Sequence, residues 1–350
     1  MRPLFQRFPT LSNHISEQGF AHLPTPVECH DFSGQQVWVK RDDLSHSAYG
    51  GNKVRKLELI LPEVQRLGAR RVITFGATGT HHGLATAVFC KQQGLACDLL
   101  LFDQPVTPLV QENIQLLAAQ GAHLHHCGSL ANTLRRFYFH PGRLSKQNYF
   151  LFAGGSNVLG VLAFINAALE LKQQIDQGQC VIPSVIYCPA SSNATLAGLT
   201  LGVALAGLST TVVGVRVAPA KVGPFDSCTP KAVRALMQKT VKWLQQRGID
   251  WPVAVRSATI MNDWYGAGYG FPTEAARQAA EVFEATVGVP LDPTYTAKCF
   301  AAVRASQLPG PVMYWHTLNS MPLTPLMQGL EQQQIPASLR RLLTAPTLTP

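Results

Sequence analysis

One rhythm recurs three times in the first half of the chain: an amphipathic stretch ends at a glycine, and a short, mostly apolar stretch follows. The glycines are Gly68, Gly94 and Gly121, and the stretches that follow are 72–75, 99–102 and 123–125. Glycine ends a helix easily because it adopts positive φ at no steric cost, and short apolar strands are typical of sheets covered on both faces. The rhythm therefore predicts βαβ units, in which a parallel sheet carries helices on both faces.

A second series of the same kind starts near Gly160. It has helical patterns at 161–174 and 195–206 and strand patterns at 185–188, 212–215 and 312–315. With 350 residues, of which 46% are hydrophobic and 14% charged, the chain can bury enough surface for two domains. A short helix is expected at 339–343, and residues 345–350 are expected to fray.

Charge and cysteine content narrow the class of protein. The net charge is +9, but the basic residues are scattered, and pairs such as Arg135-Arg136 precede apolar residues. A solvated basic surface is therefore expected rather than a nucleic-acid site. The eight cysteines form no C-x-x-C pair and no long apolar stretch occurs, so we expect reduced thiols, no membrane partner and a cytoplasmic location.

The densest chemical signal is the turn Gly50-Gly51-Asn52-Lys53, which opens a helical pattern. A lysine at a helix N-terminus beside Arg55 and Lys56 lies in positive potential, which lowers its pKa and favours the neutral amine needed for a Schiff base. Taken alone, the pattern also fits a plain Gly-rich turn before a basic helix face.

With the preceding V-K-R-D-D-L at 39–44, the segment G-G-N-K-V-R-K-L-E at 50–58 resembles a family of pyridoxal 5′-phosphate (PLP) enzymes. This family, of the tryptophan synthase β-like fold (fold type II), holds D-cysteine desulfhydrase and 1-aminocyclopropane-1-carboxylate deaminase. The resemblance continues in order from about Leu23 to Thr317, through 74–82, 154–160, 197–199, 268–274, 292–298 and 316–317.

The resemblance implies an α/β protein with two open, twisted parallel-sheet domains, helices on both faces of each sheet, and PLP in the cleft between the domains. Residues 1–54 and 161–335 would form the larger PLP-binding domain, 55–160 a smaller α/β domain, and 336–350 a C-terminal tail. A homodimer is also implied.

Site residues follow from the same resemblance. Lys53 would carry PLP as an aldimine, and the catalytic residues would be Lys53, Thr80, Tyr269 and Tyr295. The cofactor contacts would be Asn52, Lys53, His81, Ser191, Ser192, Asn193, Ala194, Thr195 and Thr317. The substrate contacts would be Thr80, His81, His82 and Tyr269.

Several positions depart from the family pattern. Thr80 and His81 stand where the family has serine and asparagine, and residues 191–195 replace every glycine of G-S-G-G-T. From the residues alone, 191–195 also fit a helix cap, and a lone tyrosine is often a packing residue. Thr296 stands where the deaminases have glutamate, which favours the desulfhydrase-like branch.

The function implied is a PLP-dependent lyase that takes a small amino acid, with D-cysteine giving pyruvate, ammonia and sulfide. A 1-aminocyclopropane-1-carboxylate deaminase is the alternative, and hydrolase activity is an additional expectation. A PLP-binding homologue with lost or redirected activity, and an unrelated binding module, also stay open. The cluster His123, His125, His126 and Cys127 invites a zinc site, but no fourth ligand stands at a reliable spacing, so we expect no metal.

Overall fold

The computed structural model describes residues 2–348 and divides the chain into two compact units. The first unit comprises the chain up to Leu59 together with Ser156–Ser320, and the second comprises Ile60–Gly155 together with the chain from Met321 on. The sequence prediction instead kept 161–335 in the larger domain and treated 336–350 as a separate tail.

Hydrogen bonds explain why the C-terminal segment belongs to the second unit. Gln120 Nε2 donates to Leu326 O at 2.5 Å, and Gln111 Nε2 donates to Leu342 O at 2.9 Å. Leu348 N also donates to Val106 O at 2.7 Å, so the expected fraying does not extend to Leu348. Residues 349 and 350 lie outside the described part of the chain.

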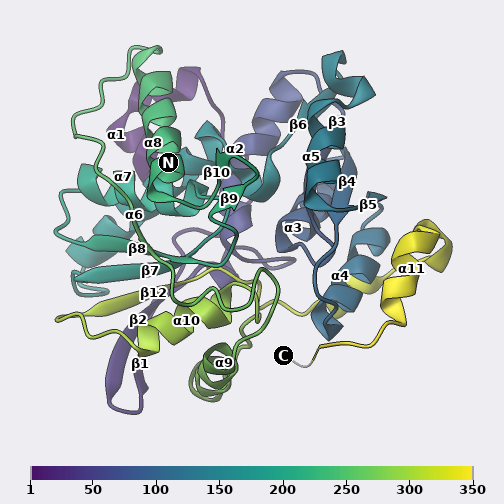
Figure 1. The fold of residues 1–350 in the computed structure, drawn as a ribbon. Helices are drawn as coiled ribbons and strands as arrows, with labels where there is room; N and C mark the ends of the chain where they lie inside the picture. The colour runs from purple at the N-terminus through teal and green to yellow at the C-terminus, as the bar shows by residue number, and fades with distance from the viewer. Residues whose placement is uncertain (1, 349–350) are drawn as a thin grey trace. The chain divides into compact units, whose positions relative to one another are not determined.

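Within the described residues, the first unit contains a six-stranded sheet in the order β1-β2-β12-β7-β8-β11 (Figure 1). The strands are β1 (Val27–Phe32), β2 (Gln35–Arg41), β7 (Val185–Ala190), β8 (Thr211–Arg216), β11 (Thr259–Met261) and β12 (Val312–His316). β1 pairs antiparallel with β2, and the other pairs are parallel. The sheet is therefore mixed rather than wholly parallel, because a tight turn with positive φ at Ser33 and Gly34 folds β1 back along β2.

Helices cover both faces of this sheet, with α6, α7 and α8 on one face and α9 and α10 on the other (Figure 1). The helical elements are α1 (Pro3–Arg7), η1 (Pro9–Asn13), η2 (Asp42–Leu44), α6 (Val158–Asp176), α7 (Ala194–Leu205), α8 (Pro230–Gln245), α9 (Glu274–Val287) and α10 (Thr296–Arg304). A short ribbon of β9 (Lys221–Val222) and β10 (Phe225–Asp226) follows β8. On the α9/α10 side, the rings of Phe32, Phe283 and Phe300 pack together in the core.

Helix α6 is, within residues 2–348, the one helix long and apolar enough to cross a membrane by length and composition. However, 78% of that stretch is buried inside the protein. Burial of this kind is typical of a core helix, which is hydrophobic all round because protein surrounds it.

The second unit is built on a parallel four-stranded sheet in the order β5-β4-β3-β6. The strands are β3 (Arg71–Ala77), β4 (Ala96–Phe102), β5 (His123–Gly128) and β6 (Asn148–Phe150). The helical elements are α3 (His81–Gln92), α4 (Pro108–Ala119), α5 (Leu130–Tyr138), η3 (Pro141–Leu144), η4 (Ala153–Gly155), η5 (Thr324–Met327), η6 (Gln332–Gln334) and α11 (Ala337–Leu343). Helix α2 (Asn52–Arg66) begins in the first unit and continues into the second.

The βαβ rhythm read from the sequence is confirmed in this unit. Gly68, Gly94 and Gly121 have φ of 71°, 67° and 73°, and each precedes a strand of the sheet. Phe75 and Leu100 pack with Phe137 of α5 on one face of the sheet. The alternate residue Leu99 points to the opposite face, where α3 packs.

Candidate active site

Lys53 lies in the first turn of α2, behind two glycines that no other residue could replace without a shift of the backbone. A Cβ on Gly50 would lie 1.7 Å from Asp43 O. Gly51 has a φ of 100°, and a Cβ there would lie 2.8 Å from Thr317 O. The Gly-Gly pair therefore brings the start of α2 against the backbone that follows β12.

The pKa of Lys53 is lowered to about 8, mainly because burial removes its ammonium from water, while the carboxylate of Asp292 acts in the opposite direction. The direction agrees with the sequence prediction, but the predicted cause, the neighbouring cations, is wrong. The charge of Arg55 is balanced by Asp42 and Glu170. The Lys53 side chain is half-buried, and its Nζ donates to Asn52 Oδ1 at 2.7 Å.

A buried ionic cluster anchors the first turn of α2. Arg55 Nη1 donates to Glu170 Oε2 at 2.8 Å, and its Nε donates to Asp42 Oδ1 at 2.9 Å. Lys40 Nζ donates to Glu170 Oε1 at 2.6 Å, and Trp315 Nε1 donates to Asp42 Oδ2 at 2.7 Å. Two cations and two carboxylates balance, so the cluster ties α2, α6, β2 and β12 together without a net buried charge.

Asn52 connects the lysine to two other predicted cofactor residues. Its Nδ2 donates to Thr195 Oγ1 at 3.1 Å, and its backbone N–H donates to Thr317 O at 3.2 Å. The structure therefore brings Thr195 and Thr317 close to Asn52 and Lys53, although these two pairs of positions lie far apart in the sequence.

The segment from Ser191 to Thr195 forms the turn from β7 into α7. Asn193 adopts a left-handed conformation with φ of 72° and makes no side-chain cap to α7. Its Nδ2 instead donates to Ser227 O at 2.6 Å, and its buried Oδ1 has no hydrogen-bond partner among the described residues. Ser156 Oγ donates to Ser192 O and holds the turn in place. The first N–H groups of α7 are therefore left without a side-chain cap, an arrangement suited to an anion.

Tyr269 and Tyr295 form a hydroxyl-to-hydroxyl hydrogen bond, and their rings are edge to face with centroids 5.9 Å apart. Burial raises the pKa of Tyr269 to about 12 even though the bond to Tyr295 opposes this, and it raises that of Tyr295 well above its usual value. Both hydroxyls are therefore protonated at neutral pH.

Asp292 fixes the backbone that carries Tyr295. Its Oδ1 accepts from Thr294 N and Tyr295 N at 3.0 and 2.7 Å, and its Oδ2 accepts from Thr296 N at 3.1 Å. The hydroxyl of Thr296 also donates to Asp292 Oδ2 at 2.6 Å. The Thr296 hydroxyl is thus used to shape the start of α10.

Thr80, His81 and His82 lie in the second unit, at the turn from β3 into α3. Thr80 Oγ1 accepts from Gly83 N at 3.1 Å and caps the helix. The β-branched side chain fits because Gly76 and Gly83 have no Cβ: one on Gly76 would lie 2.5 Å from Thr80 Oγ1, and one on Gly83 would lie 2.4 Å from Thr80 Cγ2.

The two histidines of this turn differ in environment. His81 is half-buried at the start of α3. His82 is buried, and its Nε2 lies 2.9 Å from Thr74 Oγ1. This contact packs His82 against β3, and its predicted role as a substrate contact stays a prediction.

Sequence reasoning did not predict that two lysines of the first unit, Lys56 and Lys298, are buried. The pKa of Lys56, one turn after Lys53 on α2, is lowered well below its usual value by burial and by the charge of Lys53. Lys298 is buried on α10, and burial lowers its pKa to about 8 while Asp292 opposes this. Both lysines lie within the motifs quoted above. A basic residue in the otherwise apolar part of a helical pattern was the signal that could have indicated their burial.

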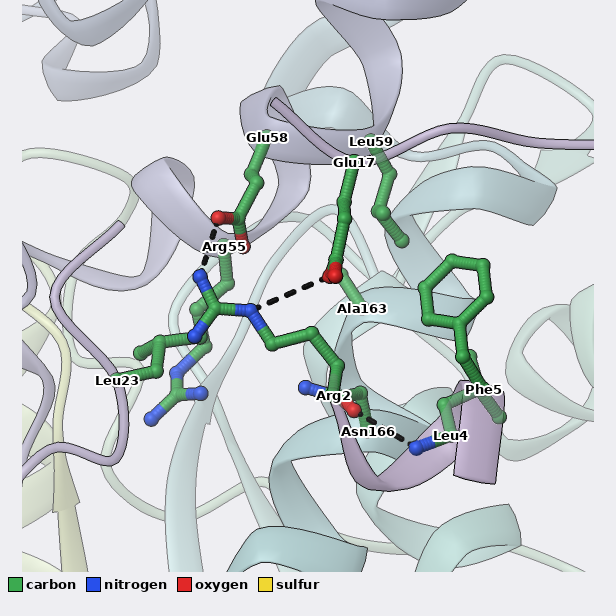
Figure 2. A pocket seen from close by; sticks show the side chains of 10 residues that line it. All are labelled: Arg2, Leu4, Phe5, Glu17, Leu23, Arg55, Glu58, Leu59, Ala163 and Asn166. Carbon is green, nitrogen blue, oxygen red and sulfur yellow. Dashed lines mark hydrogen bonds and ion pairs between the residues drawn. The ribbon is translucent and has the colours of Figure 1, made fainter. Parts of the chain in front are cut away.

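A small cavity of about 10 Å³ lies beside α2, between the N-terminal segment and α6 (Figure 2). Arg2 Nη2 donates to Glu58 Oε1 at 2.5 Å, and Leu4 N donates to Asn166 Oδ1 at 3.0 Å. The cavity has room for about one water molecule. The cavity is therefore a small gap in the packing of the N-terminal segment against α2, and it is too small to hold a substrate.

The histidine cluster of β5 has a structural explanation. His123 Nδ1 lies 3.0 Å and His125 Nε2 3.8 Å from the carboxylate of Asp98, which also accepts from Arg71 at 2.8 Å. His126 pairs with Asp103. No group of three or more His, Cys, Asp or Glu side chains is placed to hold a metal ion in the described part of the chain.

The chain matches the family model described as pyridoxal-phosphate dependent enzyme over residues 20–317. It is 31% identical over 312 residues to D-cysteine desulfhydrase of Klebsiella pneumoniae (strain 342), covering 84% of this chain and 91% of that protein.

Among solved structures, one described as an ACC deaminase homologue matches with a TM-score of 0.73 and 24% identity, covering 94% of this chain and 99% of that one. A threonine deaminase from T.th. matches with a TM-score of 0.60 and 16% identity, covering 91% and 98%. The predicted tryptophan synthase β-like α/β fold class is confirmed by these matches, with the first sheet mixed.

Proposed function

Because this chain belongs to the pyridoxal-phosphate dependent enzyme family, we propose that it eliminates the thiol group of D-cysteine as sulfide and, with the uptake of one water molecule, releases pyruvate and ammonia. The observation that carries the proposal is the 31% identity to D-cysteine desulfhydrase over 84% of the chain. The predicted cofactor and the predicted class, a PLP-dependent lyase or deaminase, are confirmed by the same matches. The additional expectation of a hydrolase is wrong.

The residues of the first unit fit pyridoxal phosphate. Lys53 offers an amine of lowered pKa, and Asn193 supplies without glycine the positive φ that exposes the backbone before α7. Two buried polar atoms, Asn193 Oδ1 and His316 Nε2, have no hydrogen-bond partner among the described residues. Buried polar atoms are normally hydrogen-bonded, so a bound ligand would supply the missing partners. We propose that Asn52, Lys53, Ser191, Ser192, Asn193, Ala194, Thr195 and Thr317 hold the cofactor.

In this proposal, Lys53, Tyr269 and Tyr295 carry out the proton transfers. When bound, pyridoxal phosphate supplies an electron sink for the negative charge that develops at the α-carbon of the substrate. With a pKa of about 8, Lys53 holds a useful fraction of neutral amine near pH 7 and can accept a proton at Nζ. Tyr269 and Tyr295 stay protonated, so their bonded hydroxyls can pass a proton between them. Thr80 and His81 stay predicted contacts of substrate and cofactor.

The preference for a thiol substrate over the cyclopropane amino acid rests on Thr296. A glutamate at this position would bring a carboxylate, whereas the threonine hydroxyl is neutral and already donates to Asp292. Without a glutamate at this position, the ring nitrogen of a bound cofactor would be less readily protonated, and the ring would draw electrons less strongly. A thiolate is a good leaving group and tolerates the weaker sink better than the opening of a cyclopropane ring does.

The test is a comparison of substrates with one purified preparation. Sulfide and pyruvate are measured from D-cysteine, L-cysteine and β-chloro-D-alanine, and 2-oxobutyrate is measured from 1-aminocyclopropane-1-carboxylate, with Lys53→Ala as control. We expect D-cysteine to be turned over fastest. Faster turnover of the cyclopropane substrate would favour the deaminase, and no turnover by a protein that retains visible absorbance would indicate a redirected activity.

We also propose that the enzyme is a cytoplasmic homodimer. All eight cysteines lie in the described range and are free thiols, as a reducing compartment would keep them. Light scattering after size exclusion should give twice the chain mass of 38.0 kDa, and cell fractionation should recover the activity in the soluble cytoplasmic fraction.

A further inference from the structure

Lys298 is a buried cation without a carboxylate partner. Its residue is fully buried, and among the described side chains no acid lies within ion-pair distance of its Nζ. Burial of an ammonium group without a counterion is costly unless hydrogen bonds satisfy it. The two oxygens that receive the hydrogen bonds of Lys298 show which segment it holds.

Both oxygens are backbone carbonyls of one turn. Lys298 Nζ donates to Tyr265 O at 2.7 Å and to Gly268 O at 3.2 Å, and it lies 5.6 Å from the centre of the Tyr265 ring. The turn reverses at Gly266, with φ of 69°, and leads directly into Tyr269. Lys298 therefore holds the backbone immediately before one of the two bonded tyrosines.

The other tyrosine belongs to the same helix as the lysine. Tyr295 is the N-cap of α10, and Lys298 lies three residues later, on the same side of the helix. The turn at 265–269 thus meets α10 at two points, through the tyrosine hydroxyls and through the lysine and two carbonyls. Asp292 fixes the Tyr295 side of this arrangement, and Lys298 fixes the Tyr269 side.

We propose that Lys298 is a positioning residue that holds the 265–268 turn so that the Tyr269 hydroxyl stays bonded to Tyr295. The inference deepens the function proposed above, because it concerns the proton-transfer pair of that reaction. Lys298 takes no part in the chemistry itself: its Nζ is occupied by two carbonyl oxygens, whereas that of Lys53 is held by one side-chain amide.

The first test is independent of activity. The protein is loaded with pyridoxal phosphate and carries 3-fluorotyrosine at position 269, and its ¹⁹F resonance is compared between the native protein and Lys298→Met. We expect one narrow resonance in the native protein, and a shifted or broadened one in the variant. An unchanged resonance would overturn the proposal, whether or not the protein acts on D-cysteine.

The second test is a double-mutant cycle of Lys298→Met and Tyr269→Phe, with kcat and KM measured for D-cysteine. A misplaced tyrosine should lower kcat by about 10²-fold, with KM within about threefold of the native value and borohydride trapping at Lys53 unchanged. The double variant should be no slower than Tyr269→Phe alone. Losses that multiply would show that Lys298 acts independently of Tyr269.

If Lys298→Met does not fold, Lys298→Gln, whose shorter side chain still carries an amide N–H donor, replaces it in both comparisons and should give a smaller effect of the same kind. Absence of any D-cysteine turnover by the native protein would contradict the proposed function, and the fluorine measurement would still decide the role of Lys298.

Discussion

Asn52 Nδ2 donates a hydrogen bond to Thr195 Oγ1 at 3.1 Å, so the residue next to Lys53 is tied to the first turn of α7. The same amide accepts from Lys53 Nζ through its Oδ1. One side chain therefore sets the amine and the uncapped helix start relative to each other, and a ligand that binds both would find them already in place.

Loss of a hydroxyl at the start of α7 should weaken cofactor binding. We expect Thr195→Val and Ser192→Ala each to cost about 1.5–3 kcal/mol of pyridoxal phosphate affinity, the usual value for a hydrogen bond to a charged group. Equilibrium titration in the visible range measures the change. Thr200→Val is the control, because the Thr200 hydroxyl donates to Leu196 O within the same helix. Unchanged affinity in both test variants would leave 191–195 as a simple helix start.

Capture of the cofactor by the apoprotein should depend on pH through Lys53. Only the neutral amine reacts, and burial lowers the Lys53 pKa to about 8. The capture rate should therefore rise about tenfold per pH unit below pH 8 and level off above it. Stopped-flow absorbance gives the profile.

Asp292→Asn should move the midpoint of that profile to lower pH, because the carboxylate of Asp292 favours the charged form of Lys53. Asp250→Asn, an exposed site, is the control and should leave the midpoint in place. A midpoint that does not move in Asp292→Asn would mean that this carboxylate has no influence on the amine.

The fit of Thr80 between two glycines predicts a selective rescue. Gly83→Ala should destabilise the protein by about 1–3 kcal/mol, because the new methyl group meets Thr80 Cγ2. Thr80→Ser removes that methyl group and keeps the cap to Gly83 N, so most of the loss should be regained in the double variant. Gly76→Ala, which meets Thr80 Oγ1 instead, should not be rescued. Chemical denaturation of all five variants measures these differences.

The buried cluster of Glu170 should dominate the acid stability of the first unit. Although burial alone would raise the pKa of Glu170, the charges of Arg55 and Lys40 lower it to about 2. Its contribution to stability is therefore complete above about pH 4.5 and is lost as the pH falls toward 2. Glu170→Gln leaves an uncompensated buried charge and should cost about 3–5 kcal/mol at pH 7.

Lys172→Ala is the matched control for this substitution. Lys172 lies two residues later on α6 and pairs with Asp176 at the surface, so its loss should change the free energy of unfolding by about 0–1 kcal/mol. Equal losses in the two variants would contradict the assigned role of the cluster.

Three strands of the second unit, β3, β4 and β5, were predictable because each follows its own helix and glycine in the sequence. Strand β6, which follows the short η3 turn, was not predicted. The hairpin of β1 and β2 was not predicted, although Ser33-Gly34 between the two strands is a local turn signal. The pairing of β2 with β12, where Val37 lies opposite Val312, joins strands that lie far apart in the chain. No local pattern in a single sequence reports a pairing of that kind.

The position of Lys53 was likewise readable from the Gly-Gly-Asn-Lys turn, but the cause of its lowered pKa was not. Arg55 was counted as a free cation because its partner Glu170 lies 115 residues away. Lys298 was missed as a positioning residue for a similar reason: the carbonyls that it binds belong to a turn 30 or more residues earlier.

The pairing of β2 with β12 also sets an order of events during synthesis. Asp42 and Trp315, which share a hydrogen bond, are separated by 273 residues, so a ribosome that adds 5–20 residues per second needs roughly 14–55 s between them. During that time the nascent chain has β1 and β2 but not the strand that completes their sheet, whereas β3 to β6 form a contiguous set. The yield of the first unit should therefore depend more than that of the second on chaperones that shield exposed strands. It should also depend more on the rate of elongation before residue 312.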